Sequence, residues 1–197
     1  GDTYLNDPSI EKAVSYLNNN PDVGVLGPKI SDDNGEFQYS CRRGKADPIM
    51  VLWKDLGLER ILGRGFDEYK LHRISPDQIL EVESVSGSCM ILKSSLFRSL
   101  NGLDTRYFMY SEDIDLCLKV QKMGKKVIYF PEINVLHLGG VSSRQTPLRS
   151  LLYMHFSKLI FINRHYFRFP PYGLFLQLLV AARLLIKAYA ALIRRNP

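Results

Sequence analysis

No aspartate or glutamate follows Glu132 in this sequence. From residue 141 onward the charged residues are all lysine or arginine and give a charge of +9, so the first 140 residues carry −3 within the net charge of +6. This cationic part is also the most apolar part of the chain. Such a segment suits an anionic membrane surface better than a nucleic acid, so we expect a membrane partner and no nucleic-acid partner.

A long uncharged apolar run is also missing. Residues 172 to 193 are numerous enough to span a bilayer, but Arg183 and Lys187 lie in their middle, which makes a poor span. On a helix these two residues and Arg194 share one face, which predicts an amphipathic helix in the membrane plane. We therefore expect a membrane-associating helical tail over 147–197. The alternative is a helix that packs in a homodimer or against another part of the protein.

Cysteines are few and widely spaced: Cys41, Cys89 and Cys117, with no CxxC pair. This excludes a disulfide framework and a zinc knuckle, and it favours a reducing cytosol. A basic-then-apolar leader and an initiator methionine are missing as well, so we interpret the chain as a fragment of a longer protein.

Helix and strand patterns alternate over the first 140 residues. The patterns predict helices over residues 8–20, 95–100 and 111–123, and strands over 23–28, 36–40, 79–92, 127–130 and 134–138. Pro131 separates the last two of these strands, and Ser86-Gly87-Ser88 interrupts the third. The order of elements predicts an α/β fold with a mixed sheet flanked by helices.

Residues 41 to 78 form a long, weakly patterned excursion, which is more typical of a functional loop than of a simple connector. Its arginines, which include Arg42 and Arg43, can hold phosphate, but exposed and solvated charge is the preferred interpretation.

Three carboxylates lie within four residues at Glu112, Asp113 and Asp115. Ser111 is a good N-cap for the predicted helix, and Glu112 and Asp113 in its first turn are stabilised by the exposed N–H groups. These acids are therefore either a structural helix cap or an ionised general base. Asp113 and Asp115 resemble a DxD metal motif, but residues i and i+2 of a helix point about 200° apart and would not share an ion.

Four segments in this order resemble glycosyltransferase family 2, and most closely its bacterial rhamnosyltransferase-like members. They are Ser86-Gly87-Ser88-Cys89-Met90-Ile91-Leu92, Gly102-Leu103-Asp104, residues 107–117 around Ser111-Glu112-Asp113-Ile114-Asp115, and residues 135–142 around His137-Leu138-Gly139-Gly140. The resemblance is strong over the middle third of the chain and weaker over most of the rest.

The resemblance implies an inverting enzyme of the GT-A fold that uses a nucleotide-sugar donor and a divalent cation, Mg²⁺ or Mn²⁺. The catalytic base would be Asp113 or Glu112, with Asp113 preferred, and Ser86, Gly87 and Tyr110 would line the acceptor side. His137 would be a metal ligand. A loop over the donor phosphates would include Gly139, Gly140, Ser142, Ser143 and Arg144.

The first strands and the metal motif of that fold would precede the region present here. Asp2-Thr3 matches the end of an Asn-Pro-Asp-Thr form of that motif, which makes Asp2 a second candidate metal ligand. Residues 1–146 would then be the acceptor-side part of a partial GT-A domain that lacks its nucleotide-binding half. We expect such a fragment to be inactive alone.

Two functions follow from these patterns. The first is a glycosyltransferase of cell-surface polysaccharide synthesis, cytoplasmic and peripheral on the inner face of the plasma membrane, with a saccharide acceptor that is lipid-linked. The second is a non-catalytic membrane-binding or assembly module, in which the acids only cap a helix.

Overall fold

The computed structural model describes residues 3–5, 8–45, 69–138 and 147–166, together with positions 178, 181, 182, 185 and 186. Its elements, in chain order, are β1 (Thr3–Leu5), α1 (Pro8–Asn19), β2 (Val23–Ser31), the 3-10 helix η1 (Tyr39–Cys41), β3 (Arg42–Arg43), β4 (Leu80–Glu81), β5 (Ser84–Val85), α5 (Ser94–Ser99), α6 (Glu112–Lys122), β6 (Lys126–His137) and α8 (Pro147–Tyr166). The predicted α/β class is confirmed.

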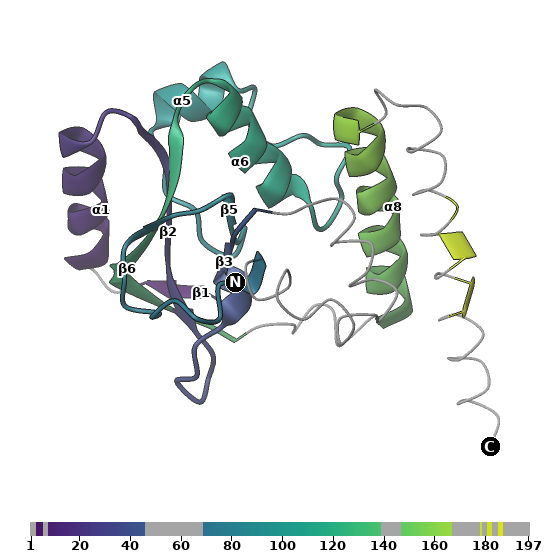
Figure 1. Ribbon diagram of the computed structural model, residues 1–197, viewed down its shortest axis with the longest axis horizontal. Helices are drawn as coiled ribbons and strands as arrows, with labels where there is room; N and C mark the ends of the chain where they lie inside the picture. The colour runs from purple at the N-terminus through teal and green to yellow at the C-terminus, as the bar shows by residue number, and fades with distance from the viewer. Residues whose placement is uncertain are drawn as a thin grey trace.

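The main sheet has four strands, and β6 is the strand that pairs with each of the others (Figure 1). β2 pairs with β6 in parallel, while β1 and β4 pair with it antiparallel. A sheet with both orientations is mixed, as the sequence predicts. A second sheet of two strands joins β3 to β5 in antiparallel.

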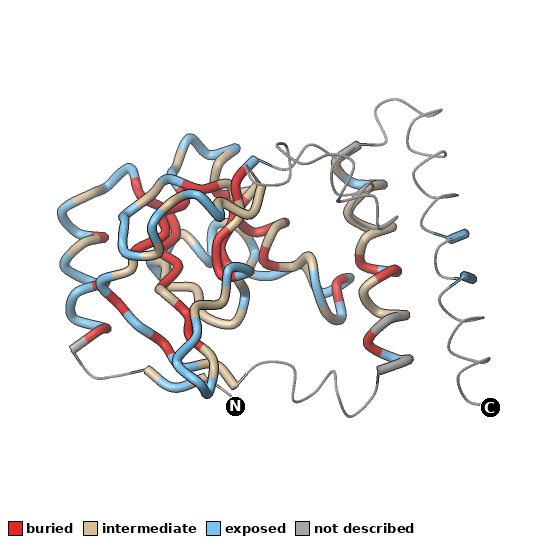
Figure 2. Tube along the Cα trace, turned by 60° about the horizontal axis from the view of Figure 1, so that its bottom comes forward, coloured by how far each residue is buried: buried red, intermediate tan, exposed pale blue. Residues whose placement is uncertain are grey.

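Apolar residues of β2 and β6 form the centre of the core. Val25, Leu26, Val127 and Tyr129 are fully buried, and α6 adds Val120. The core appears as the red stretches of the central strands in Figure 2. Helix α1 packs against β2 and β6 from one side, and α6 packs against β2, β5 and β6. The mixed sheet flanked by helices is therefore confirmed.

Gly27 allows the second sheet to lie close to β2. A Cβ atom at this position would come within 2.3 Å of the Val85 side chain on β5, a distance that a real Cβ contact does not reach. The missing side chain therefore lets β5, and the turn that follows it, approach the main sheet.

Strand β6 differs from the prediction of two strands separated by Pro131. The strand is continuous from Lys126 to His137. Its register with β2 shifts between Phe130, the partner of Pro28, and Asn134, the partner of Lys29. Residues 131 to 133 form the irregularity between these pairs. A bulge tolerates a proline because its missing N–H is not needed for the ladder.

The predicted strand over residues 36–40 is also wrong. Phe37 makes an isolated bridge to Ser31, and the chain then enters η1. Alternation over so few residues did not distinguish a strand from a turn that places Phe37 against the core.

Candidate active site

Asp113 is the centre of the candidate active site. It lies in the first turn of α6 and is only 7% exposed. Its Oδ2 accepts hydrogen bonds from Arg43 Nη1 at 3.0 Å and from the Gly87 backbone N–H at 3.1 Å, while its Oδ1 accepts one from the Ile114 N–H at 2.8 Å. These three donors fix the carboxylate in one orientation.

Glu112 has a different environment although it is the adjacent residue. Its Oε2 is buried and has no hydrogen-bond partner. Burial raises the pKa of Glu112 above its ordinary value, and the neighbouring Asp113 charge acts in the same direction. The pair therefore combines one carboxylate with three donors and one with a buried oxygen that has none, an arrangement typical of functional acid pairs.

The turn Ser86-Gly87-Ser88 lies against both acids. A Cβ atom on Gly87 would be 3.3 Å from Asp113 Cβ and 3.4 Å from Glu112 Oε1, so the backbone of this turn lies close to both acidic side chains. Within the turn, Ser86 Oγ and Ser88 Oγ share a hydrogen bond of 2.7 Å. The structure thus brings the predicted acceptor-side residues Ser86 and Gly87 to the predicted base.

The chain enters α6 through two consecutive residues in the left-handed conformation, Tyr110 with φ of 71° and Ser111 with φ of 69°. Each such residue other than glycine costs about 1–2 kcal/mol. Ser111 occupies the N-cap position of α6 as predicted, but its side chain makes no cap hydrogen bond. The left-handed backbone takes the Ser111 side chain away from the extended geometry that a cap needs. The side chain of Tyr110 is 38% exposed, and its backbone directly precedes the N-cap residue Ser111.

His137, the predicted metal ligand, lies at the end of β6 opposite Thr3 of β1. Gln38 contacts both the backbone and the ring of His137. The Gln38 amide nitrogen donates to the His137 carbonyl oxygen at 2.8 Å, and the Gln38 amide oxygen lies 3.2 Å from Nδ1. Thr3 Oγ1 in turn donates to the Ser88 carbonyl oxygen at 3.3 Å. Strand β1 therefore connects His137 to the turn that contacts Asp113.

The described residues do not by themselves form a cation site. Within the described ranges, no group of three or more histidine, cysteine, aspartate or glutamate side chains could hold a metal ion. A hard divalent cation takes about six ligands, so His137 alone is insufficient. Asp2, the other predicted ligand, lies outside the described residues, as do the predicted phosphate contacts Gly139, Gly140, Ser142, Ser143 and Arg144. The metal and phosphate assignments stay predictions.

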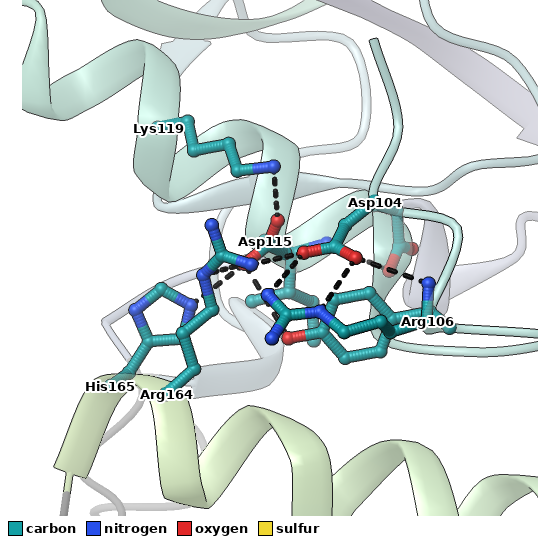
Figure 3. Close-up of polar contacts among 9 residues, drawn as sticks. Asp104, Arg106, Asp115, Lys119, Arg164 and His165 are labelled. Carbon is teal, nitrogen blue, oxygen red and sulfur yellow. Dashed lines mark hydrogen bonds and ion pairs between the residues drawn. The ribbon is translucent and has the colours of Figure 1, made fainter. Parts of the chain in front are cut away.

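Asp115 belongs to a separate cluster, as its position two residues after Asp113 predicts. It is fully buried, with Lys119 Nζ 2.8 Å from Oδ2 and His165 Nε2 donating to Oδ1 at 2.8 Å. Arg164 contacts both Asp115 and Asp104, and Arg106 also pairs with Asp104 (Figure 3). The cluster joins α6 to the end of α8, so Asp115 has a structural role.

The pKa values in this cluster follow its contacts. Burial alone would raise the pKa of Asp115, but hydrogen bonds from Lys119 and His165 bring it below its ordinary value. Hydrogen bonds from Arg106 lower the pKa of Asp104. Burial lowers the pKa of His165. The aspartates are therefore ionised and His165 is held mainly neutral near pH 7, with Nε2–H as a donor.

Arg42 and Arg43 are the residues that sequence reasoning assigned wrongly. Arg42 is 0% exposed, and Arg43 forms the ion pair with Asp113. Neither is the solvated charge that the prediction favoured. Successive residues of a strand point to opposite faces, so an Arg-Arg pair on β3 must direct one guanidinium inward wherever both faces are covered. That alternation was the available signal.

Comparison with known proteins gives several relatives by sequence, although no protein-family model matches the chain. The chain is 32% identical over 164 residues to the N-acetylglucosaminyl-diphospho-decaprenol L-rhamnosyltransferase of Mycobacterium tuberculosis, which covers 80% of this chain and 51% of that protein. It is 35% identical over 80 residues to rhamnosyltransferase WbbL of Escherichia coli, covering 41% of this chain and 30% of that protein.

A third relative is the O-antigen biosynthesis protein RfbC of Myxococcus xanthus, 31% identical over 149 residues, which cover 73% of this chain and 11% of that protein. The chain spans about half the length of the first curated relatives it matches. These alignments confirm the resemblance to rhamnosyltransferase-like proteins that the motifs indicate.

One solved structure with a related arrangement is that of GalNAc-T7 with UDP, GalNAc and Mn²⁺. It is 13% identical in sequence, with a TM-score of 0.44, and the match covers 68% of this chain and 26% of that one. Similarity at this level transfers no residue role.

Proposed function

From its relationship to rhamnosyltransferases we propose that this chain supplies the acceptor side of an inverting family 2 glycosyltransferase. The observation that carries the proposal is the Asp113 carboxyl group, which Arg43 and the Gly87 N–H hold beside the turn formed by Ser86 and Gly87. A group that only caps a helix needs no arginine partner from another strand. This arrangement favours the enzyme over the non-catalytic membrane-binding module.

In the proposed reaction, Asp113 accepts the proton of an acceptor hydroxyl as that oxygen attacks the anomeric carbon of a nucleotide-sugar donor. The new bond joins the acceptor oxygen to the anomeric carbon, and the bond from that carbon to the diphosphate oxygen breaks. The sugar configuration inverts, and a nucleoside diphosphate leaves. A hydroxyl is a poor acid, so proton removal must accompany attack. A saccharide carried on a lipid diphosphate is the proposed acceptor, as the name of the mycobacterial relative indicates for that protein.

A divalent cation, Mg²⁺ or Mn²⁺, would neutralise the leaving diphosphate in such a reaction. Among the described residues, His137 is the only predicted ligand for such a cation. Every step above is therefore assigned to this chain's own side chains. Gln38 would orient His137 whether or not an ion binds.

The experiment replaces Asp113 with asparagine in the full-length protein that contains this chain. We expect release of nucleoside diphosphate from a nucleotide-linked L-rhamnose donor to fall by about 10²–10⁴-fold, since an amide cannot accept the proton. Asp77→Asn is the matched control, because Asp77 is an exposed partner of Lys29 on the surface. Circular dichroism would show that both variants are folded. Transfer by Asp113→Asn at the rate of the control would refute the proposed base.

A further inference from the structure

A pocket of about 430 Å³ opens beside the candidate base. Its walls come from η1, β3 and the segment that returns to the core at residues 69–72. The Gly44 N–H donates to the Tyr69 carbonyl oxygen at 2.8 Å, which joins the end of β3 to the segment 69–72. The side chains that carry the argument are those of Tyr39, Arg42, Arg43, Lys70 and His72.

The lining of this pocket is cationic and aromatic. No aspartate or glutamate is among its described lining residues, whereas arginine, lysine and histidine all are. Tyr39 and His72 stack with ring centroids 4.3 Å apart and planes at 15°, which makes a flat wall. Cations with a stacking wall are the groups that recognise phosphate joined to a sugar or a base.

Arg42 is a lining residue of the pocket that is 0% exposed and has no anionic partner among the described residues. Its guanidinium donates to the carbonyl oxygens of Ile74 and Ser75 and lies 4.6 Å from the Tyr129 ring centroid, but its Nε has no partner. No carboxylate in the described ranges pairs with it. Since Arg42 is closed to solvent, it acts on the pocket through its electric field, which an anion in the pocket would compensate.

Arg43 connects the pocket to the base. Its side chain lines the pocket and is 19% exposed, and its Nη1 lies 3.0 Å from Asp113 Oδ2. A second anion in the pocket would share this guanidinium with Asp113. This competition would weaken the ion pair between Arg43 and Asp113. The Asp113 Oδ2 atom would then be more available to accept the proton of an incoming hydroxyl.

We propose that this pocket binds a diphosphate group and that its occupation loosens the Arg43–Asp113 ion pair. The inference rests on the proposed function, because it makes Arg43 a positioning residue for the base. Two sources of diphosphate fit the same chemistry: the diphosphate of a lipid-linked acceptor and that of a nucleoside diphosphate. In either case ligand binding would prepare the base for proton transfer.

The test measures binding of inorganic pyrophosphate, farnesyl diphosphate and uridine diphosphate to the full chain by isothermal titration calorimetry. We expect pyrophosphate to bind and Arg43→Gln to weaken it at least tenfold. Lys126→Gln is the matched control, because Lys126 pairs with the exposed Asp22 at the start of β6, and we expect it to change affinity less than twofold. Tighter binding of farnesyl diphosphate identifies the lipid-linked source, and tighter binding of uridine diphosphate identifies the nucleotide source.

His72→Ala is a second variant that leaves the Arg43–Asp113 pair intact. His72 is exposed, so we expect a stable protein with severalfold weaker binding, because the stacked wall is lost. Carboxyl ¹³C NMR provides a separate readout: the Asp113 signal should move on addition of pyrophosphate in the wild type and in Lys126→Gln. The proposal would be overturned if the wild type did not bind pyrophosphate. It would also be overturned if Arg43→Gln and His72→Ala both bound pyrophosphate as tightly as the wild type.

The outcomes separate this inference from the proposed function. If Asp113→Asn abolishes transfer while Arg43→Gln and His72→Ala bind pyrophosphate normally, the function stands and the pocket assignment fails. If Arg43→Gln loses pyrophosphate while Asp113→Asn still transfers sugar, the pocket binds diphosphate and the assigned base is wrong.

Discussion

At the scale of single residues, neighbouring acids in α6 differ in their hydrogen-bond partners. Asp113 has three donors, Glu112 has a buried oxygen without a donor, and Asp115 is held by Lys119 and His165. The helical rotation between successive residues separates their environments within a single turn. A cluster of acids in a sequence can therefore contain several independent sites.

Ser111→Ala tests whether the serine side chain contributes to the start of α6. Loss of a working N-cap costs about 1 kcal/mol, but the Ser111 hydroxyl makes no such bond, so we expect the free energy of unfolding to change by less than about 0.5 kcal/mol. Urea denaturation measures this. A loss of about 1 kcal/mol would restore the capping role that the sequence predicts.

Glu112→Gln tests the buried carboxylate through the pH dependence of stability. Its pKa is raised in the folded state, so the folded protein binds the proton more tightly than the unfolded chain does. Glu112 therefore reduces stability as pH rises above its ordinary pKa of 4.5, and not below it. We expect Glu112→Gln to be more stable than the wild type at pH 7, with the difference shrinking toward pH 4 in denaturation experiments.

Asp104→Asn is the control of opposite sign. Hydrogen bonds from Arg106 lower the pKa of Asp104, so its contribution is present above its ordinary pKa and is lost as pH falls. This variant should be less stable than the wild type at pH 7 and approach it as the pH is lowered below 4. The same pH trend for Glu112→Gln and Asp104→Asn would contradict the assigned environments.

At the scale of elements, α8 is attached to the preceding part of the chain by three sets of contacts. Ser157 Oγ donates to the Met109 carbonyl oxygen at 2.7 Å, and Tyr153 packs on Phe108 with ring centroids 4.4 Å apart. The ion pairs of Asp104 and Asp115 with Arg164 add the third attachment. Phe108 and Met109 belong to the segment that leads through Tyr110 and Ser111 into α6, so α8 supports the segment that precedes the candidate base.

Asp115→Ala tests this attachment. Removal of one partner of a buried charge cluster costs roughly 3–5 kcal/mol, because Lys119 loses its anion and His165 loses its acceptor. We expect a loss of that size in urea denaturation and faster amide hydrogen exchange in α8. Asp22→Ala is the matched control, because its pair with Lys126 is exposed and should contribute little. Equal effects of both substitutions would show that the cluster does not hold α8.

The sequence predicts elements better than it predicts their connections. Periodicity found α1, β2 and α6, and left-handed glycine correctly marked the end of α6, where Gly124 has φ of 73°. It did not show that β6 continues through Pro131, because the bulge depends on pairing with β2. Nor did it find the Arg43–Asp113 pair, because those residues are 70 positions apart. The local motif around Asp113 was readable, whereas its partner depended on the fold.

At the scale of the whole molecule, the C-terminal part differs in chemistry from the domain before it. Leu178, Leu185 and Ile186 are 61–70% exposed, and the described residues between 178 and 186 are helical. Among the described residues, no helix is long and apolar enough to cross a bilayer. Exposed apolar side chains on a cationic segment are consistent with the sequence-based expectation that this tail binds an anionic membrane surface.

Deletion of residues 170–197 tests the tail. We expect the full chain to sediment with vesicles that contain anionic lipid, and the shortened chain to lose most of this binding. Vesicles of zwitterionic lipid are the control, because they lack the charge that attracts lysine and arginine. If the shortened chain binds anionic vesicles as well as the full chain, the membrane role of the tail is wrong.

The place of β6 at the centre of the main sheet has a consequence for synthesis of the protein. β1, β2 and β4 each pair with β6, which is the last of these strands to leave the ribosome, and roughly 100 positions separate Val23 from its partner Lys126. The apolar strand β2 therefore lacks its main partner strand until β6 has been synthesised. Contacts so distant in sequence slow folding and expose strand edges to other chains. Nascent chains that stop before residue 126 should accordingly depend on chaperones and aggregate without them.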